Sequence, residues 1–148
     1  MSDHLLRFIP DDPDYALDTN QINQIKQLDW CGSNARIDVN ETVQFADAGE
    51  NFETVSCPFC NSDLMGWWGE TMSAAYSDEN GFTHMDVITP CCIKATTLQD
   101  LIYSPPQGFY KSIIEIRGPA HPVAMVNPIC SQLAQITNAS WRVIHAHY

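Results

Sequence analysis

Basic side chains are scarce in this sequence. Its 148 residues include 7 Lys and Arg against 18 Asp and Glu, and the formal net charge is -11 at pH 7. The first 80 residues hold 15 of these acids and 3 of the bases. Because an acidic surface repels phosphate backbones, this charge disfavours direct binding of nucleic acid and makes a basic protein the expected partner. The alternative is that the acids only keep the protein in solution.

Long apolar runs are also absent. No stretch approaches the roughly 18 to 20 residues that a bilayer span needs, and residues 1–7 contain no apolar core of a signal peptide. We therefore expect a cytoplasmic protein with no membrane partner. Hydrophobic residues still make up 45% of the chain, which is ordinary for a folded protein, and its length corresponds to one domain spanning residues 1–148.

Motifs of common catalytic sites are missing too, including a glycine-rich phosphate loop, a Gly-x-Ser-x-Gly turn and a His-Glu-x-x-His helix. His145 and His147 lie two apart on an expected strand and so share one face, which makes them candidates for a second metal site or an acid–base group. An ordinary strand end is the alternative for both, and His121 is expected in a loop. The sequence therefore favours a non-enzymatic protein and leaves open an enzyme that uses His145, His147 and nearby acids.

Six cysteines are present, and their spacing is the strongest functional signal in the chain. In a reducing compartment, paired cysteines are more often metal ligands or catalytic groups than disulfides. Cys57 and Cys60, separated by Pro58 and Phe59, lie across one tight turn from which both sulfurs can reach an ion at about 2.3 Å. Asn61 follows, and Asn tolerates the left-handed backbone that such a turn needs. Cys31 and Cys130 lack close partners and are expected to be small buried apolar residues.

A tetrahedral site needs two more ligands, and Cys91 with Cys92 are the candidates. Adjacent residues point in different directions in an extended chain, so both can bind one ion only if the backbone turns sharply there. Pro90 favours such a turn, whereas Ile93 stands where Gly would help. Four cysteines would close the coordination shell of a structural zinc and leave no position for a reactive water. Three cysteines with His84, or a redox-active Cys-x-x-Cys, are the alternatives.

The hydrophobic pattern predicts an α+β fold. Two β-α-β halves would form a ferredoxin-like sheet, with a zinc-ribbon-like unit inserted at about residues 52–96. Expected strands cover residues 5–9, 35–45, 82–89, 109–117 and 141–147. Expected helices cover residues 18–30, 63–80 and 97–103, and a further helix is expected to begin at residue 127. Glu41 interrupts the alternation of residues 35–45, which indicates either one strand that passes the core edge or a turn at 40–41. Trp67 and Trp68 are expected to cover the core or the zinc site.

The whole set of motifs resembles a group of uncharacterised small bacterial proteins with a zinc-ribbon-like insert. The likeness spans nearly the whole chain and rests on residues 8–13, 45–52, 57–60, 67–68, 90–92 and 146–148. Ile93 stands where the group has Gly. The resemblance implies a zinc site and carries no activity with it.

The charge and the metal site together favour a protein-interaction or inhibitor/immunity-type protein that offers an acidic face to a basic partner. A zinc-ribbon adaptor in transcription is a further alternative.

Overall fold

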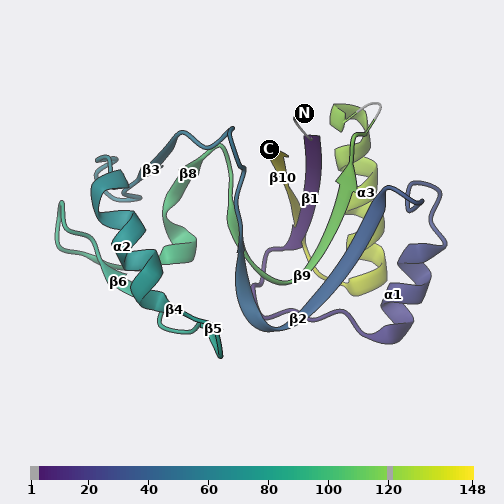
Figure 1. Ribbon diagram of the computed structural model, residues 1–148, viewed down its shortest axis with the longest axis horizontal. Helices are drawn as coiled ribbons and strands as arrows, with labels where there is room; N and C mark the ends of the chain where they lie inside the picture. Colours follow the sequence, from purple (N-terminus) through teal and green to yellow (C-terminus); the bar gives the residue numbers. More distant parts are fainter. Residues whose placement is uncertain (1–3, 120–121) are drawn as a thin grey trace.

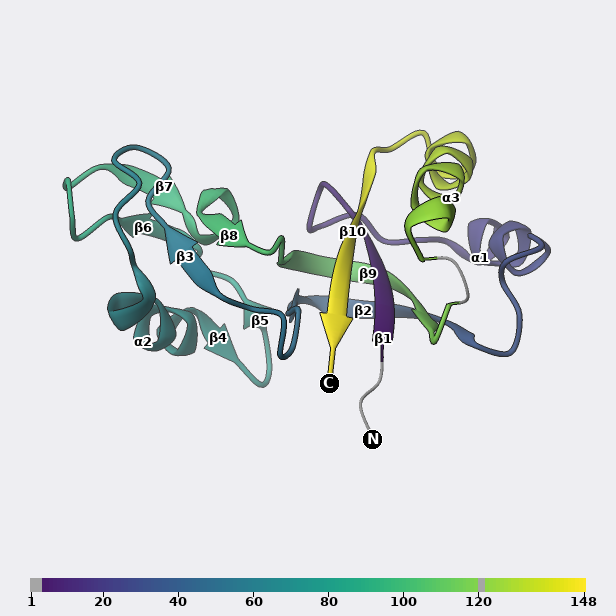
Figure 2. The same ribbon diagram turned by 90° about the horizontal axis from the view of Figure 1, so that it is seen from above.

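The computed structural model describes residues 4–119 and 122–148, which form a mixed α/β structure (Figure 1). One part holds the long strands and two helices, and the other holds one helix and several short strands. Figure 2, seen from above, shows the same two parts next to each other. His121, expected in a loop, lies outside the described residues, as do residues 1–3.

The first part follows the order strand, helix, strand twice. Its elements are β1 (His4–Pro10), α1 (Thr19–Lys26), β2 (Ala35–Ala46), β9 (Gly108–Arg117), α3 (Pro122–Thr137) and β10 (Trp141–His147). β1 pairs antiparallel with both β10 and β9, and β9 pairs antiparallel with β2. The complete sheet has six strands in the order β10-β1-β9-β2-β5-β4, and it is mixed because β5 lies parallel to β2.

Alternation of side chains along β1 places its apolar residues on both faces of the sheet. Leu6 and Phe8 are fully buried in the cluster that includes Ile25 of α1 and Leu133 of α3. Ile9 is buried on the opposite side in a smaller cluster. The two helices therefore cover one face of the sheet, as Figure 1 shows.

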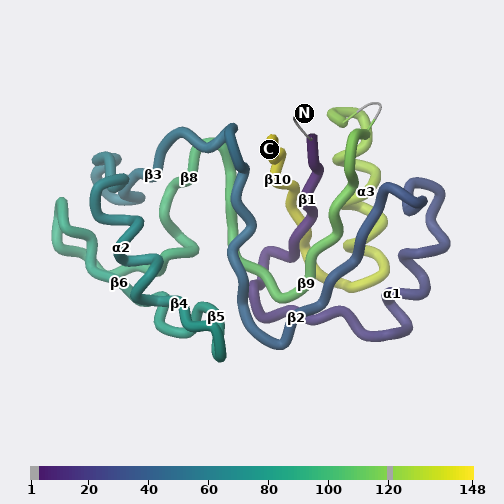
Figure 3. Tube along the Cα trace, in the orientation of Figure 1, coloured from purple at the N-terminus to yellow at the C-terminus, as the bar shows by residue number. Residues whose placement is uncertain are grey.

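The second part is the central segment, which we define as residues 54–104. Its elements are β3 (Thr54–Ser56), α2 (Met65–Ala75), β4 (Tyr76–Ser77), β5 (Gly81–Phe82), β6 (Asp86–Ile88), β7 (Ala95–Thr97), a 3-10 turn (Leu98–Asp100) and β8 (Ile102–Ser104). β3 pairs with β8 and β6 with β7, each as a two-stranded antiparallel sheet. Val55, Leu64 and Leu98 share a buried cluster with Phe109 of β9, so this core continues into the first part. Figure 3 traces the chain from β2 through the central segment and back to β9.

Five expected elements were wrong in extent or type. The helices expected at residues 18–30 and 63–80 are shorter, because α1 ends at Lys26 and α2 ends at Ala75, where the chain turns into β4 and pairs with β5. The strand expected at residues 82–89 is divided into β5 and β6, because β5 pairs with β2 and β4 whereas β6 pairs with β7. The helical segment expected at 97–103 is the end of β7, a 3-10 turn and β8. Helix α3 begins at Pro122, five residues before the expected start, and contains Pro128 in its interior. Proline suits a first helical position, but Pro122 occupies that position here.

The single-strand interpretation of residues 35–45 is confirmed, since β2 runs unbroken through Glu41. Its pairing with β9 shifts register between Val39 and Gln44, which is where the polar residue interrupts the alternation. Trp67 and Trp68 are half-buried and pack against the core of the central segment, as expected.

Candidate metal centre

The first cysteine pair lies in the turn between β3 and α2. The Asn61 N–H donates to the Cys57 carbonyl over 2.9 Å, which closes the turn, and the Phe59 N–H donates to Cys57 Sγ over 3.4 Å. Asn61 has φ 60, the left-handed conformation that this turn was expected to need. The Asp63 carboxylate then accepts from the Met65 N–H and satisfies one free donor at the start of α2.

The second pair lies in the turn between β6 and β7, which repeats the backbone of the first. The Ile93 N–H donates to the Thr89 carbonyl over 3.0 Å, and Ile93 has φ 56. Thr89 therefore occupies the position that Cys57 has in the first turn, and its hydroxyl lies 3.2 Å from Cys92 Sγ. The turn thus lets the adjacent Cys91 and Cys92 approach the same centre.

The two turns bring all four sulfurs together. The Sγ atoms of Cys57, Cys60, Cys91 and Cys92 lie within 4.8 Å of one another. Cys57 lies 3.7 Å from Cys92, and Cys60 lies 3.3 Å from Cys91. Four sulfurs held at about 2.3 Å from a tetrahedral zinc would lie roughly 3.8 Å apart, so this donor set fits that ion.

The four sulfurs differ in exposure. Cys57 is buried in the core of the central segment, and Cys92 is half-buried and packs against that core. Cys60 and Cys91 are exposed. On the outer side, the Lys94 ammonium lies 5.3 Å from the centre of the Phe59 ring. The site therefore has one side anchored in the core and one side open to solvent.

Local hydrogen bonds and burial separate the thiol pKa values of the cluster. The side chain and backbone of Ser62 lower the pKa of Cys60 to about 6. Partial desolvation of the thiol and the neighbouring sulfurs raise the pKa of Cys91 to about 12. Burial raises the pKa of Cys57, but the N–H groups of Cys60 and Phe59, together with the thiols of Cys91 and Cys92, outweigh it and hold that pKa below its usual value. The cluster therefore offers thiolate to a cation, and a bound ion would displace the remaining protons.

Sequence reasoning missed two residues at the site, Thr89 and Ser62. Thr89 is fully buried, accepts a hydrogen bond from the Lys94 N–H and contacts Cys92. The sequence does contain a signal for Thr89. The hydrogen bonds of the two turns show that Thr89 and Pro90 correspond to Cys57 and Pro58, and a proline follows the first residue in both turns. Ser62 Oγ lies 3.2 Å from Cys60 Sγ.

The other candidate residues lie apart from this cluster. Among the described residues, the four cysteines are the only group of three or more His, Cys, Asp or Glu with ligand atoms this close together. His84 is exposed in the loop between β5 and β6. His147 of β10 contacts Glu50 over 3.5 Å and lies 5.4 Å from His4, measured between ring centres, while His145 lies two residues before it on the same strand.

We expect Ile93→Gly to stabilise the protein by about 1 kcal/mol, because a left-handed backbone is costly for a side chain with a Cβ and Gly adopts it freely. Ile93 is 74% exposed, so little apolar burial is lost. Denaturant unfolding in the presence of added zinc measures the difference. The matched control is Asn61→Gly at the equivalent position, where a change within about 0.5 kcal/mol is expected. A loss of stability in Ile93→Gly would contradict this account of the turn.

None of the helices in the described ranges combines the length and the hydrophobicity that a membrane crossing requires. No protein-family model, curated protein or solved structure matches this chain.

Proposed function

We propose that the chain is a zinc protein whose ion is structural and is held by Cys57, Cys60, Cys91 and Cys92. The observation that carries this proposal is the group of four sulfurs within 4.8 Å of one another. Thiolate-only donor sets of this shape are typical of zinc or iron–sulfur sites, and the paired turns match zinc knuckles. Four protein ligands leave no open coordination position, so the ion stabilises the fold and activates no water.

The central segment is then a zinc-ribbon-like insert in a ferredoxin-like fold. The order β10-β1-β9-β2, antiparallel throughout, with a helix between β1 and β2 and another between β9 and β10, supports the ferredoxin-like assignment. Two equivalent turns that meet at one cluster of sulfurs support the zinc-ribbon-like assignment.

The role that fits this architecture is non-enzymatic binding of a basic protein in the cytoplasm. Residues 54–104 carry six acidic side chains and one basic side chain, Lys94, so the insert is acidic. Opposite charge speeds association and selects basic partners. Zinc would hold the short strands of the insert in a fixed shape, because strands of two or three residues supply few backbone hydrogen bonds of their own.

Affinity capture from an extract of the native host tests this role. The immobilised, zinc-loaded chain should retain basic proteins at about 0.05 M salt and release them at about 0.5 M, where charges are strongly screened. A triple variant with Glu70→Gln, Asp78→Asn and Glu79→Gln neutralises three exposed acids of the insert and should retain less. Equal retention by this variant would refute an acidic docking face. Capture or gel-shift of nucleic acid would instead support an adaptor in transcription.

A further inference from the structure

The candidate metal centre has an inner and an outer pair of cysteines. Cys57 is fully buried and Cys92 is half-buried against the core of the central segment, whereas Cys60 and Cys91 are exposed. The Sγ atoms of the outer pair lie 3.3 Å apart, and those of the inner pair lie 3.7 Å apart. A reagent dissolved in water therefore meets Cys60 and Cys91 first, and these two sulfurs are close enough to react with each other.

Hydrogen-bond donors of the protein stabilise three of the four sulfurs. A zinc-bound thiolate carries no proton, so a hydroxyl or N–H group beside it acts as the donor. Such a hydrogen bond stabilises the negative charge on the sulfur and lowers its reactivity toward electrophiles. The donors are the Phe59 N–H at 3.4 Å from Cys57 Sγ, the Ser62 hydroxyl at 3.2 Å from Cys60 Sγ and the Thr89 hydroxyl at 3.2 Å from Cys92 Sγ.

Cys91 lacks such a donor. The contacts of its Sγ are with other sulfurs, Cys60 at 3.3 Å and Cys92 at 3.9 Å. No N–H or hydroxyl group of residues 4–119 and 122–148 donates to it. Cys91 is thus both exposed and without a stabilising hydrogen bond, which makes its sulfur the most reactive of the four toward an electrophile in solution.

We infer that Cys91 and Cys60 form a site of reversible oxidation, at which a peroxide converts the two zinc-bound thiolates into a disulfide and releases the ion. This inference rests on the proposed function, because the reaction begins from the zinc-bound chain. It adds a regulation that binding of a basic partner does not require, since the zinc content of the chain then depends on the level of peroxide around it.

The reaction consumes one molecule of peroxide per chain. The Cys91 thiolate attacks one peroxide oxygen, the O–O bond breaks and hydroxide leaves, so that Cys91 becomes a sulfenic acid. The Cys60 thiolate then attacks the Cys91 sulfur, which forms the S–S bond and expels a second hydroxide. The two sulfurs lose two electrons and the peroxide gains them, while two protons from solvent convert the hydroxide ions into water. Zinc keeps only the sulfurs of Cys57 and Cys92, completes its shell with water and dissociates.

The disulfide also replaces one structural effect of the ion. Cys60 belongs to the turn between β3 and α2, and Cys91 belongs to the turn between β6 and β7, so the new bond joins two turns whose cysteines are 31 residues apart. A crosslink of this kind restricts the unfolded chain. The oxidised chain should therefore remain folded without zinc, and reduction should restore the metal site.

Treatment of the full-length, zinc-loaded chain with hydrogen peroxide tests this inference. The double variant Cys31→Ser/Cys130→Ser serves as the background, because it keeps only the four ligand thiols. Zinc release, followed with a metal-binding dye, should be complete at one peroxide per chain, and reduction with dithiothreitol in the presence of zinc should reverse it. Release that needs many equivalents of peroxide would indicate unselective oxidation and would overturn the inference.

Mapping of the disulfide tests which sulfurs react. Digestion before aspartate places the two cysteine pairs of the sequence on separate peptides, residues 47–62 and 86–99. Mass spectrometry of the oxidised chain should find these two peptides joined, and fragment ions should assign the bond to Cys60 and Cys91. Any other disulfide among the four ligands as the main product would overturn the inference.

Limited alkylation of the same zinc-loaded background identifies the most reactive sulfur. Iodoacetamide at less than one equivalent should label Cys91 roughly tenfold more than the inner pair. Ser62→Ala removes the donor beside Cys60 and should raise the label on Cys60 several-fold. The matched control is Thr89→Val, which removes the hydroxyl beside the less exposed Cys92 and should leave Cys92 unlabelled. If the inner pair is labelled as fast as Cys91 before either substitution, the inference is overturned.

Zinc content and melting temperature separate this inference from the proposed function. A chain that binds no zinc would overturn both. A chain that binds zinc and keeps it in excess peroxide, with all four thiols reduced, would overturn this inference alone. The oxidised, zinc-free chain should also melt several degrees above the reduced, chelated chain, because its disulfide joins the two turns. Equal melting temperatures would refute that consequence of the oxidation.

Discussion

Replacement of Cys57 by serine is expected to release the zinc and to lower the melting temperature by roughly 10 °C, in line with the loss of several kcal/mol that follows removal of a metal ligand. Cys57 is the fully buried member of the four ligands and its sulfur also accepts the Phe59 N–H. A serine oxygen is a poor zinc ligand, and the remaining three sulfurs would leave the ion open to water. Chelation of the metal from the unmodified protein should produce a similar shift.

The chain offers matched controls for this experiment. Cys31 and Cys130 were expected to be buried but are only half-buried, in the other part of the molecule, and they belong to no metal-binding group in the described structure. Serine at either position should leave one zinc per chain by elemental analysis. The double variant His145→Ala/His147→Ala should also retain that zinc, and a second metal lost with these histidines would support the enzyme alternative. A Cys57→Ser protein with full zinc content and unchanged melting would refute the structural role.

Local pattern was sufficient to predict the strands of the sheet. Alternation marked β1, β2, β9 and β10 within one or two residues, because each of these strands has a buried face along most of its length. The start of α1 is also set locally, because Asp18 and Gln21 exchange hydrogen bonds across the first turn of the helix. The division of these strands into two strand-helix-strand units was predicted from the order of the elements along the chain.

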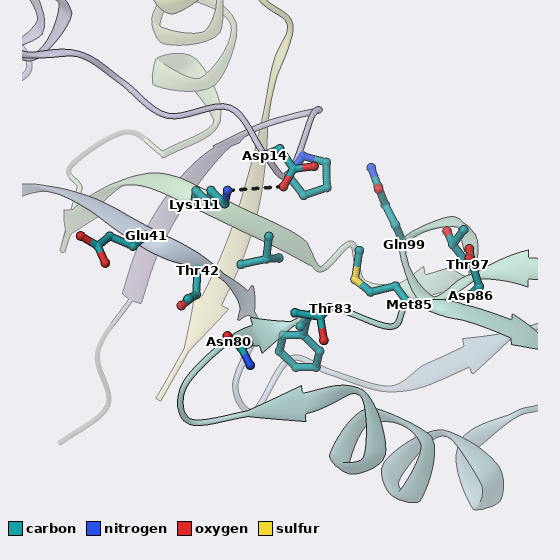
Figure 4. A pocket seen from close by; sticks show the side chains of 13 residues that line it. Asp14, Glu41, Thr42, Asn80, Thr83, Met85, Asp86, Thr97, Gln99 and Lys111 are labelled. Atoms are coloured by element: carbon teal, nitrogen blue, oxygen red, sulfur yellow. Dashed lines mark ion pairs between the residues drawn. The ribbon is translucent and has the colours of Figure 1, made fainter.

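The central segment was harder to predict because its elements are too short for periodicity to identify. Strands of two or three residues such as β5 and β6 are defined by their partners, which are distant in sequence. The cysteine spacing predicted which sulfurs meet, but the way in which Cys91 and Cys92 share one centre depends on the left-handed Ile93. The cleft that Figure 4 shows is lined by residues from five separate parts of the chain, so no local signal in the sequence pointed to it.

An aromatic cluster joins the central segment to the sheet. Phe109 of β9 is fully buried, and its ring centre lies 5.0 Å from Phe45 of β2 and 5.1 Å from Phe82 of β5. Phe45 in turn lies 5.8 Å from Trp68 of α2, whose indole N–H donates to the Tyr103 hydroxyl. Contacts of this kind contribute beyond simple burial. The cluster and the metal centre therefore hold the central segment at two separate places.

Phe109→Ala is accordingly expected to lower the free energy of unfolding of the zinc-loaded protein by about 3–5 kcal/mol, the usual cost of deleting a buried phenyl ring. The matched control is Phe59→Ala, because Phe59 is 48% exposed at the metal site and its loss should cost within about 0.5 kcal/mol. Denaturant unfolding followed by tryptophan fluorescence measures both. A small effect of Phe109→Ala would mean that the cluster does not couple the two parts.

Repeating the measurement after chelation tests whether the zinc and the cluster act on one cooperative unit. If zinc holds the central segment folded, its removal frees that segment, and Phe109 loses its contacts with Phe82 before the substitution is made. The substitution should then cost less in the chelated protein than in the zinc-loaded protein, so the two perturbations should be less than additive. Full additivity would instead mean that the central segment keeps its packing without the ion. In that case the four cysteines would bind a metal that the fold does not need.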